Sequence, residues 1–178
     1  MDAPMWVFGY GSLIWDPGFP VAERQLARLS GWHRSFCMRS IHHRGCETAP
    51  GLVLALDEAP GATCAGVAFR VVPGAEPATL AALRERELIS SAYLERLLPV
   101  ILSTGASVEA LVYVIDPHHL QYCGGMALED QAQIIATAHG GRGPNRDYLF
   151  ATAAHLHDLG IADPDLDWLA ARVRALPG

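Results

Sequence analysis

The stretch VFGYGSLIW, residues 7–15, carries glycines at a spacing that suits ligand binding. Gly9 and Gly11 interrupt an apolar segment that otherwise has the character of a β-strand, and glycine in such a segment often marks a bulge or the close approach of a ligand. Without side chains at these positions, successive backbone N–H groups form a concavity for an anion or a developing oxyanion. The alternative is a β-bulge that binds nothing.

Three familiar glycine motifs do not fit this turn. A dinucleotide-binding G-x-G-x-x-G motif requires a small residue where this chain has Ile14. A phosphate-binding loop requires Gly-Lys-Ser/Thr, and this segment contains no lysine. A G-x-S-x-G nucleophile elbow requires glycine at positions 10 and 14, which are Tyr10 and Ile14.

The second informative stretch is LAALREREL, residues 80–88, which places a carboxylate on the apolar side of a predicted helix. At helical spacing, Leu80, Leu83 and Glu87 share one stripe, whereas Glu85 points away from it. Burial of a carboxyl group is costly and raises its pKa, which suits a general base near neutral pH. The alternatives are an ion pair with a neighbouring arginine or a helix end that has already reached solvent.

The elements that must position these residues follow from hydrophobic patterning and turn signals. Strands are expected over residues 5–10, 31–39, 51–57, 64–72, 97–103 and 107–115. Helices are expected after Pro77 and over residues 127–138, 145–159 and 164–175; Asn145 and Asp163 suit N-caps, Pro164 a first turn and Gly160 a C′ stop. Strands first and helices later predict an α+β fold with a curved sheet or barrel, in one domain over residues 1–178.

Composition and charge exclude several classes of function. The net charge is −6 and no run of five basic residues occurs, which argues against a nucleic-acid or basic membrane surface. The four cysteines form no C-x-x-C pair, which favours separate thiols in a reducing compartment. The start of the chain lacks the basic segment of a signal peptide, and the apolar runs are too short to span a bilayer. We expect a soluble, cytoplasmic protein that binds neither nucleic acid nor membrane.

Histidines at positions 42–43, 118–119, 155 and 157 raise the question of a metal site. Adjacent histidines on a strand point to opposite faces, and no third ligand follows at a suitable spacing. A Cys46 nucleophile with a nearby histidine is similarly weakly indicated. We therefore expect no metal and no cofactor.

Several stretches, in order along the chain, together resemble the ChaC-type γ-glutamylcyclotransferase family. They cover residues 7–15, 34–45, 50–56, 66–70, 86–93, 128–130 and 143–150. The resemblance implies a small mixed β-barrel with helices around it. It implies cleavage of a γ-glutamyl compound, in this branch glutathione, into 5-oxoproline and a free amine, here Cys-Gly. Some relatives have Gly-Gly where this chain has Ser90-Ser91.

The resemblance also implies which residues act. Glu87 matches the catalytic glutamate and would serve as general base and then acid, because the substrate's own α-amine is the nucleophile. Tyr148 matches a substrate-contacting tyrosine, with core packing as the alternative. The expected substrate cradle lies near the start of the chain and consists of Val7, Phe8, Gly9, Tyr10, Gly11, Ser12 and Leu13.

Some alternatives stay open from the sequence alone. The turn at residues 9–13 would bind either the carbonyl oxygen or the α-carboxylate of the substrate, and Tyr10 either packs or lines the pocket. Arg39 and Arg44 would pair with substrate carboxylates or form ordinary ion pairs. The competing functions are cyclotransferase action on other γ-glutamyl amines and a catalytically silent γ-glutamyl-binding module.

Overall fold

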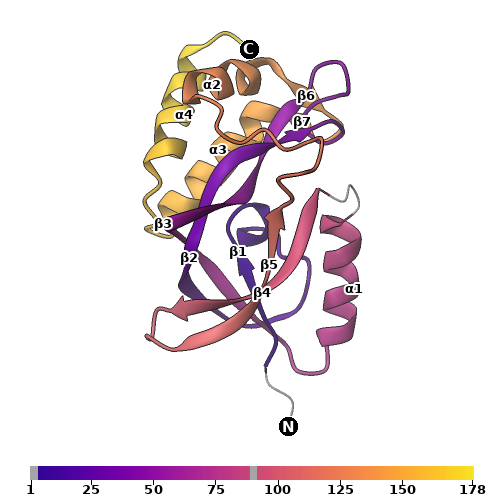
Figure 1. Ribbon diagram of the computed structural model, residues 1–178, viewed down its shortest axis with the longest axis vertical. Helices are drawn as coiled ribbons and strands as arrows, with labels where there is room; N and C mark the ends of the chain where they lie inside the picture. Colours follow the sequence, from indigo (N-terminus) through magenta and orange to yellow (C-terminus); the bar gives the residue numbers. More distant parts are fainter. Residues whose placement is uncertain (1–3, 89–91) are drawn as a thin grey trace. The chain divides into compact units, whose positions relative to one another are not determined.

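The computed structural model describes residues 4–88 and 92–178 (Figure 1). Two compact units share the chain. The barrel unit consists of Met1–Arg34 and Leu56–Asp116, and the helical unit of Ser35–Ala55 and Pro117–Gly178. The single domain expected over residues 1–178 stays a prediction. The Ser90-Ser91 pair lies outside the described residues.

The first part of the chain is mainly strand and the last part mainly helix. In chain order the elements are β1 (Trp6–Gly9), the 3₁₀ turn η1 (Ser12–Ile14), β2 (Val21–Ser40), β3 (Gly51–Val71), α1 (Glu76–Glu87), β4 (Tyr93–Leu102), β5 (Ser107–Ile115), α2 (Leu128–Thr137), β6 (His139–Gly140), β7 (Gly143–Pro144), α3 (Asn145–Asp158) and α4 (Pro164–Ala175).

Five strands close into a barrel in the order β1-β3-β2-β4-β5. β1 runs antiparallel to β3, from the pair Trp6↔Arg70 to the pair Gly9↔Val67, and parallel to β5, with Val7 opposite Leu111. The α+β class with a small mixed barrel and helices is therefore confirmed. β1 is paired on both sides, which fixes the position of the turn that follows it.

The side chains of β1 alternate between two apolar clusters, as the period of a strand requires. Trp6, Phe8 and Tyr10 enter the larger cluster, together with Leu29 and Val112. Val7 enters the other cluster. That cluster also contains Leu13, Leu83, Leu111 and Tyr113.

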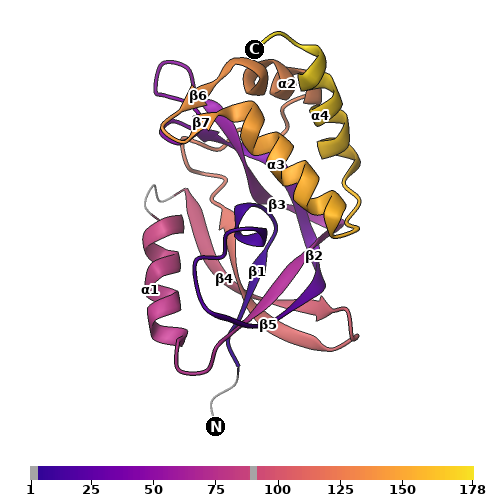
Figure 2. The same ribbon diagram turned by 180° about the vertical axis from the view of Figure 1, so that it is seen from behind.

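Helix α1 covers this second cluster with its apolar stripe. Leu83 is buried, and Leu80 and Leu88 are partly buried against the same cluster, while Glu85 is exposed. Both views show α1 alongside the strands of the barrel unit (Figures 1 and 2). The predicted helical stripe is confirmed, and it brings the last turn of α1 close to β1 and η1.

In the helical unit, α2, α3 and α4 pack on one another, and α3 is hydrogen-bonded to Leu52 and Leu54 near the start of β3. Asp163 caps α4, because its carboxylate accepts the Leu166 N–H at 3.1 Å. Gly160 follows α3 with φ of +72°, as expected of a C′ residue. These two predictions of helix ends are confirmed.

The prediction that Asn145 is an N-cap is wrong. Pro144 occupies the cap position, and Asn145 is the first residue of α3. The Asn145 amide instead pairs with the backbone of Leu52 on β3: its Oδ1 accepts the Leu52 N–H and its Nδ2 donates to the Leu52 carbonyl, both at 2.8 Å. The amide completes the hydrogen bonding of a strand residue, which a local cap signal does not reveal.

Three strand predictions differ from the structure. β2 begins at Val21 rather than at residue 31, and β4 begins at Tyr93 rather than at residue 97. β3 joins the two strands expected over residues 51–57 and 64–72 and runs unbroken through Gly61, although Gly61 has φ of +87°, which is strained for other residues. In each case pairing with neighbouring strands extends the strand beyond its locally apolar segment.

We predict that Asn145→Ala lowers the free energy of unfolding. The substitution leaves the N–H and C=O of Leu52 without the Asn145 amide, and the loss of two such buried bonds costs about 2–4 kcal/mol. Urea denaturation measures the difference. His157→Ala, at an exposed position of the same helix, is the control and should change the value by less than about 0.5 kcal/mol. Equal midpoints for Asn145→Ala and the unsubstituted protein would contradict this prediction.

Candidate active site

The turn after β1 is tight and leaves little room for side chains. The Ile14 N–H donates to the Gly11 carbonyl at 2.9 Å, which closes the η1 turn. A Cβ atom added at Gly9 would lie 3.1 Å from both the Leu13 Cβ and the Phe69 ring. The chain therefore turns here through a short 3₁₀ segment, and a side chain at position 9 would be in tight contact with Leu13 and Phe69.

A further glycine, which the sequence analysis did not single out, supports the same turn. A Cβ atom added at Gly66 on β3 would lie 2.4 Å from the Gly9 carbonyl oxygen and 2.7 Å from the Phe8 ring. A Cβ atom cannot lie so close to a carbonyl oxygen. β3 therefore has glycine at the position that faces the Gly9 carbonyl. The pairing of β1 with β3, rather than any local motif, explains this requirement.

Tyr10 is held on both its backbone and its side chain. The buried Arg34 guanidinium donates to the carbonyls of Tyr10 at 3.2 Å and Ala65 at 2.8 Å. The Tyr10 hydroxyl donates to the Tyr113 carbonyl at 2.6 Å. The Tyr10 ring is buried in the barrel core, which favours packing of this side chain over lining of a pocket.

The side chains of Val7 and Phe8 are fully buried, and that of Leu13 is nearly so. The exposed fraction of Val7 and of Phe8 is zero for the whole residue, backbone included. Their assignment to the substrate cradle, like that of Gly9, Gly11 and Ser12, stays a prediction.

Glu87 is the last residue of α1 and is partly buried, with 15% of its side chain exposed. Its Oε1 lies 3.4 Å from the Arg86 Nε, so the ion pair with a neighbouring arginine is present. The Arg86 guanidinium also donates to the Ser12 hydroxyl at 3.0 Å and to the Asp16 carbonyl at 2.6 Å. The structure thus links Glu87 and the glycine-containing turn through a single guanidinium.

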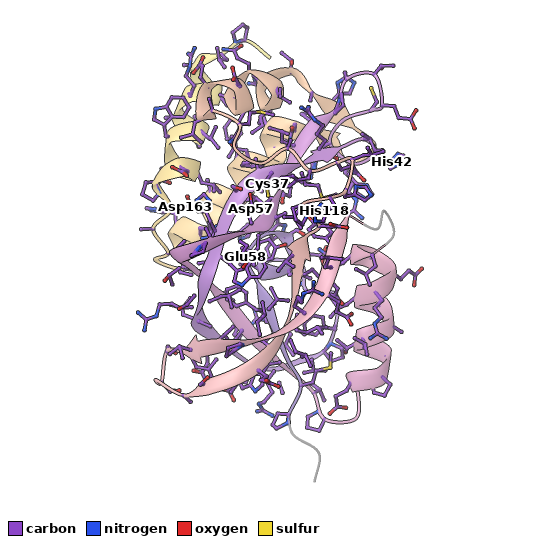
Figure 3. The ribbon with its side chains drawn as sticks, in the orientation of Figure 1. Cys37, His42, Asp57, Glu58, His118 and Asp163 are labelled. Atoms are coloured by element: carbon purple, nitrogen blue, oxygen red, sulfur yellow. The ribbon has the colours of Figure 1, made fainter. Side chains whose placement is uncertain are left out.

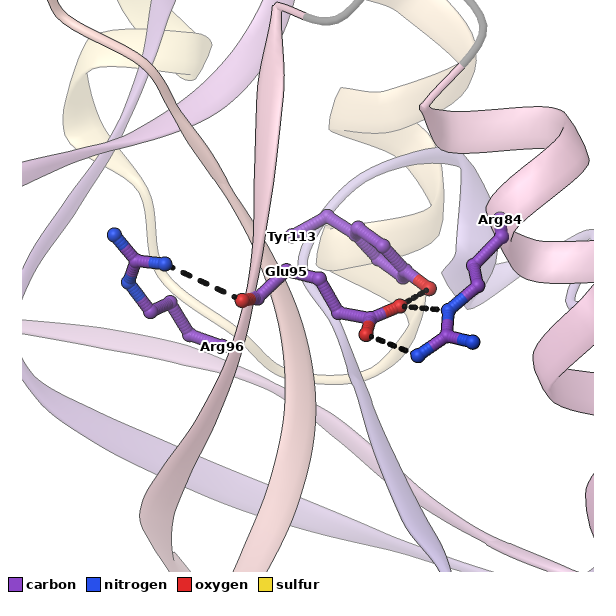
Figure 4. Close-up of polar contacts among 4 residues, drawn as sticks. All are labelled: Arg84, Glu95, Arg96 and Tyr113. Carbon is purple, nitrogen blue, oxygen red and sulfur yellow. Dashed lines mark hydrogen bonds and ion pairs between the residues drawn. The ribbon is translucent and has the colours of Figure 1, made fainter.

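A second carboxylate, Glu95 on β4, lies in the barrel unit and was missed by the sequence analysis. Figure 4 shows its contacts: the Arg84 guanidinium donates to both carboxylate oxygens, at 3.1 and 2.9 Å, and the Tyr113 hydroxyl donates at 2.9 Å. Arg84 and then Tyr113 hold the pKa of Glu95 below its usual range, against the opposing effect of burial. The sequence offered no signal, because the three partners lie on three different elements.

The two carboxylates are suited to different roles. The Arg84 guanidinium donates to both oxygens of Glu95 and so favours the charged form of this carboxylate. A carboxylate stabilised in this way is a weak base. Burial, together with the negative charges of Glu95 and Glu87, raises the pKa of Tyr113, so its hydroxyl stays protonated near neutral pH. Of the two carboxylates, Glu87 is the one joined to the glycine-containing turn.

Tyr148 lies in the helical unit and is buried by its neighbours there. Its hydroxyl accepts the Leu54 N–H at 3.2 Å, and its ring meets that of Phe36 edge-on, with centroids 6.0 Å apart. The Arg44 guanidinium lies 5.6 Å above the same ring and donates to the carbonyls of Arg142 and Pro144. These contacts account for packing of Tyr148, and its role in substrate binding stays a prediction.

The histidines come from separate segments of the chain. Figure 3 labels His42, which follows β2, and His118, which follows β5, together with Cys37 on β2. Within residues 4–88 and 92–178, no three His, Cys, Asp or Glu side chains gather in a way that could hold a metal ion. In the same residues, no helix has the length and apolar character needed to cross a membrane. The four cysteines are free thiols.

Comparison with known proteins gives consistent matches over almost the whole chain. The family model described as ChaC-like protein matches residues 5–176. A glutathione-specific γ-glutamylcyclotransferase of Escherichia coli (strain K12) is 38% identical over 175 residues, which cover 98% of this chain and 75% of the relative. The γ-glutamylcyclotransferase 2-3 of Arabidopsis thaliana is 36% identical over 176 residues, covering 96% and 88% of the two chains.

The fold has a close counterpart among solved structures. A crystal structure of a yeast γ-glutamyl cyclotransferase specific to glutathione superimposes with a TM-score of 0.88, covering 99% of this chain and 98% of the other. The sequences are 22% identical, so this likeness concerns the fold.

The Arg84–Glu95 contact predicts a dependence of stability on pH. The pKa of Glu95 is lower in the folded protein than in the unfolded chain, so the contact stabilises the fold above the unfolded-state pKa. The contribution is lost as pH falls through the folded-state pKa. We expect Glu95→Gln to lower the free energy of unfolding at pH 7, and we expect this loss to shrink as the pH falls from the ordinary glutamate pKa towards the lowered pKa of the folded state.

Urea denaturation of both proteins from pH 7 to pH 3 measures this difference. Arg84→Met should show the same dependence on pH, since it removes the other half of the contact. A destabilisation by Glu95→Gln that is the same at every pH would contradict the assignment.

Proposed function

Since this chain belongs to the ChaC-like family, we propose that it is a glutathione-specific γ-glutamylcyclotransferase with Glu87 as its general base. The observation that carries the proposal is the guanidinium of Arg86, which contacts the Glu87 carboxylate and the Ser12–Asp16 segment together. A carboxylate and a glycine-containing turn are the two parts that the reaction requires.

The reaction is an intramolecular aminolysis. The α-amine of the γ-glutamyl group attacks its own γ-carbonyl, a C–N bond closes the five-membered lactam of 5-oxoproline, and the C–N bond to the cysteine nitrogen breaks to release Cys-Gly. No water is consumed, and the nucleophile belongs to the substrate. The protein has to hold the substrate folded, move one proton and stabilise the oxyanion.

Glu87 moves the proton in this proposal. An α-amine has a pKa of about 8 and is mostly protonated at neutral pH, so a base must accept a proton before or during attack. The ion pair with Arg86 supports a charged Glu87 at the start of the reaction. The protonated Glu87 then passes the proton to the departing cysteine nitrogen.

The turn at residues 9–13 stabilises the oxyanion or binds the α-carboxylate. Close packing at Gly9 and Gly66 supports a rigid turn, and a rigid turn holds its N–H groups in place before charge develops. One well-placed donor lowers such a barrier by about 3–4 kcal/mol. The proposed cradle consists of residues Val7 to Leu13, with backbone N–H donors between Gly9 and Leu13, and Tyr148 is proposed as a further substrate contact.

The proposal extends to the surroundings of the reaction. The substrate is a small molecule, the product pair includes 5-oxoproline, and the compartment is the cytoplasm, where free thiols such as those of this chain persist. The same chemistry on other γ-glutamyl amines is a second candidate, because the Arabidopsis relative is named without reference to glutathione.

We predict that Glu87→Gln lowers kcat/KM for glutathione by about a hundredfold to ten-thousandfold, the usual contribution of general acid–base catalysis. The assay incubates the protein with glutathione, or separately with γ-glutamyl-alanine, and detects 5-oxoproline and the released amine. Glu85→Gln, an exposed glutamate on the same helix, is the matched control and should keep its activity.

Each outcome of this assay has a clear meaning. Release from glutathione alone supports the specific enzyme, and release from both substrates supports the second candidate. Absence of 5-oxoproline from the unsubstituted protein would overturn the proposed function. Full activity in Glu87→Gln would show that another group is the base.

A further inference from the structure

Arg86 makes three polar contacts in the barrel unit, two with the Ser12–Asp16 segment and one with the end of α1. Its Nη1 donates to the Asp16 carbonyl at 2.6 Å, its Nη2 donates to the Ser12 hydroxyl at 3.0 Å, and its Nε lies 3.4 Å from the Glu87 carboxylate. Its side chain is 23% exposed. A guanidinium has donors fixed in one plane, so these contacts together define the orientation of the group.

The place of Glu87 in the helix gives this contact its importance. Glu87 is the last residue of α1. Leu88 is the C-cap residue, and its N–H donates to the Arg84 carbonyl at 3.0 Å. A side chain at a helix end has fewer neighbouring turns to restrict its rotamers. The guanidinium supplies a partner on the side that faces Ser12 and Asp16.

Arg86 also sets the charge around Glu87. Charged and titratable groups of the same unit contact one another: Arg84 on α1 and Tyr113 on β5 both contact Glu95 on β4, and Arg70 on β3 pairs with Glu23 on β2, whereas β1 carries no charged residue. Arg84 is engaged by Glu95, and Tyr113 also bonds to Glu95. Arg86, in contrast, contacts the Glu87 carboxylate.

We propose that Arg86 is a positioning residue that clamps the Glu87 carboxylate to the Ser12–Asp16 segment and keeps it charged before substrate binds. This inference rests on the proposed function for its effect on rate. Its effect on Glu87 itself does not depend on that function. Arg84, two residues earlier on the same helix, is directed to Glu95 instead and serves as the matched comparison.

The first test measures the pKa of Glu87 without using activity. Titration of side-chain carboxyl groups by ¹³C NMR, with the Glu87 resonance assigned by its loss in Glu87→Gln, compares the unsubstituted protein with Arg86→Gln and Arg84→Met. Removal of a contacting cation should raise the pKa of Glu87 by about one unit in Arg86→Gln. The change in Arg84→Met should be smaller. An unchanged Glu87 titration in Arg86→Gln would overturn the proposal.

The second test follows the rate of 5-oxoproline release. Arg86→Gln should lower kcat about tenfold to a hundredfold with KM changed less than about threefold, because a misplaced base slows the chemical step. The acidic limb of its kcat profile should move to higher pH, since a base with a raised pKa is deprotonated at higher pH. Arg86→Lys keeps the positive charge but loses the planar set of guanidinium donors. It should therefore return the acidic limb of the kcat profile to its original pH and restore only part of kcat.

The two tests separate the two proposals. If Arg86→Gln raises the pKa of Glu87 but leaves kcat unchanged, Arg86 does position Glu87, but Glu87 is not the general base. If Arg86→Gln is active and both the pKa of Glu87 and the acidic limb of the kcat profile are unchanged, the positioning role of Arg86 is overturned while the proposed cyclotransferase activity stands. If Arg86→Gln does not fold, the Arg86→Lys variant decides. A full kcat with an unshifted acidic limb of the pH profile would overturn the positioning role of the guanidinium. A lowered kcat with an unshifted acidic limb would support that role.

Discussion

The pairing of β1 on both of its edges is the constraint on which the rest of the barrel unit depends. β1 lies antiparallel to β3 and parallel to β5, and all four of its residues are buried. Both the direction and the end point of this strand are therefore fixed by its neighbours. The turn that follows is closely packed, because there is little room for a side chain at Gly9 and none at Gly66. A cradle that binds through backbone N–H groups needs this rigidity, because its donors cannot adjust as side chains do.

Helix α1 adds Glu87, the proposed acid–base group, to that scaffold. Its apolar stripe, centred on Leu83, packs against the cluster that contains Val7 and Leu13. Its last turns carry two arginines, Arg84 and Arg86. Each arginine contacts a different carboxylate: Arg84 holds Glu95, and Arg86 contacts Glu87 and the turn. The two carboxylates thus receive different environments within one unit. One is stabilised as an ion in a structural network, and the other is aligned with the proposed substrate cradle.

The sequence predicted those features that depend on residues close together in the chain. The α+β class, β1, the stripe of α1, the Asp163 cap and the partly buried Glu87 all follow from local periodicity and turn chemistry. The features that were missed depend on partners far away in the chain. Asn145 pairs with Leu52, Gly66 accommodates Gly9, and Glu95 meets Arg84 and Tyr113 from three elements. The extra length of β2 and β4 likewise comes from strand pairing, which no local pattern encodes.

A crystal structure of the Glu87→Gln variant with bound glutathione tests the central claim most directly, because the variant should bind the substrate without converting it. The account predicts that the γ-glutamyl group lies against the turn at residues 9–13, with its α-amine within hydrogen-bond reach of the residue 87 side chain. The γ-carbonyl oxygen or the α-carboxylate should accept from the N–H groups of that turn. Glutathione bound away from the turn, or with its α-amine directed away from residue 87, would contradict the account.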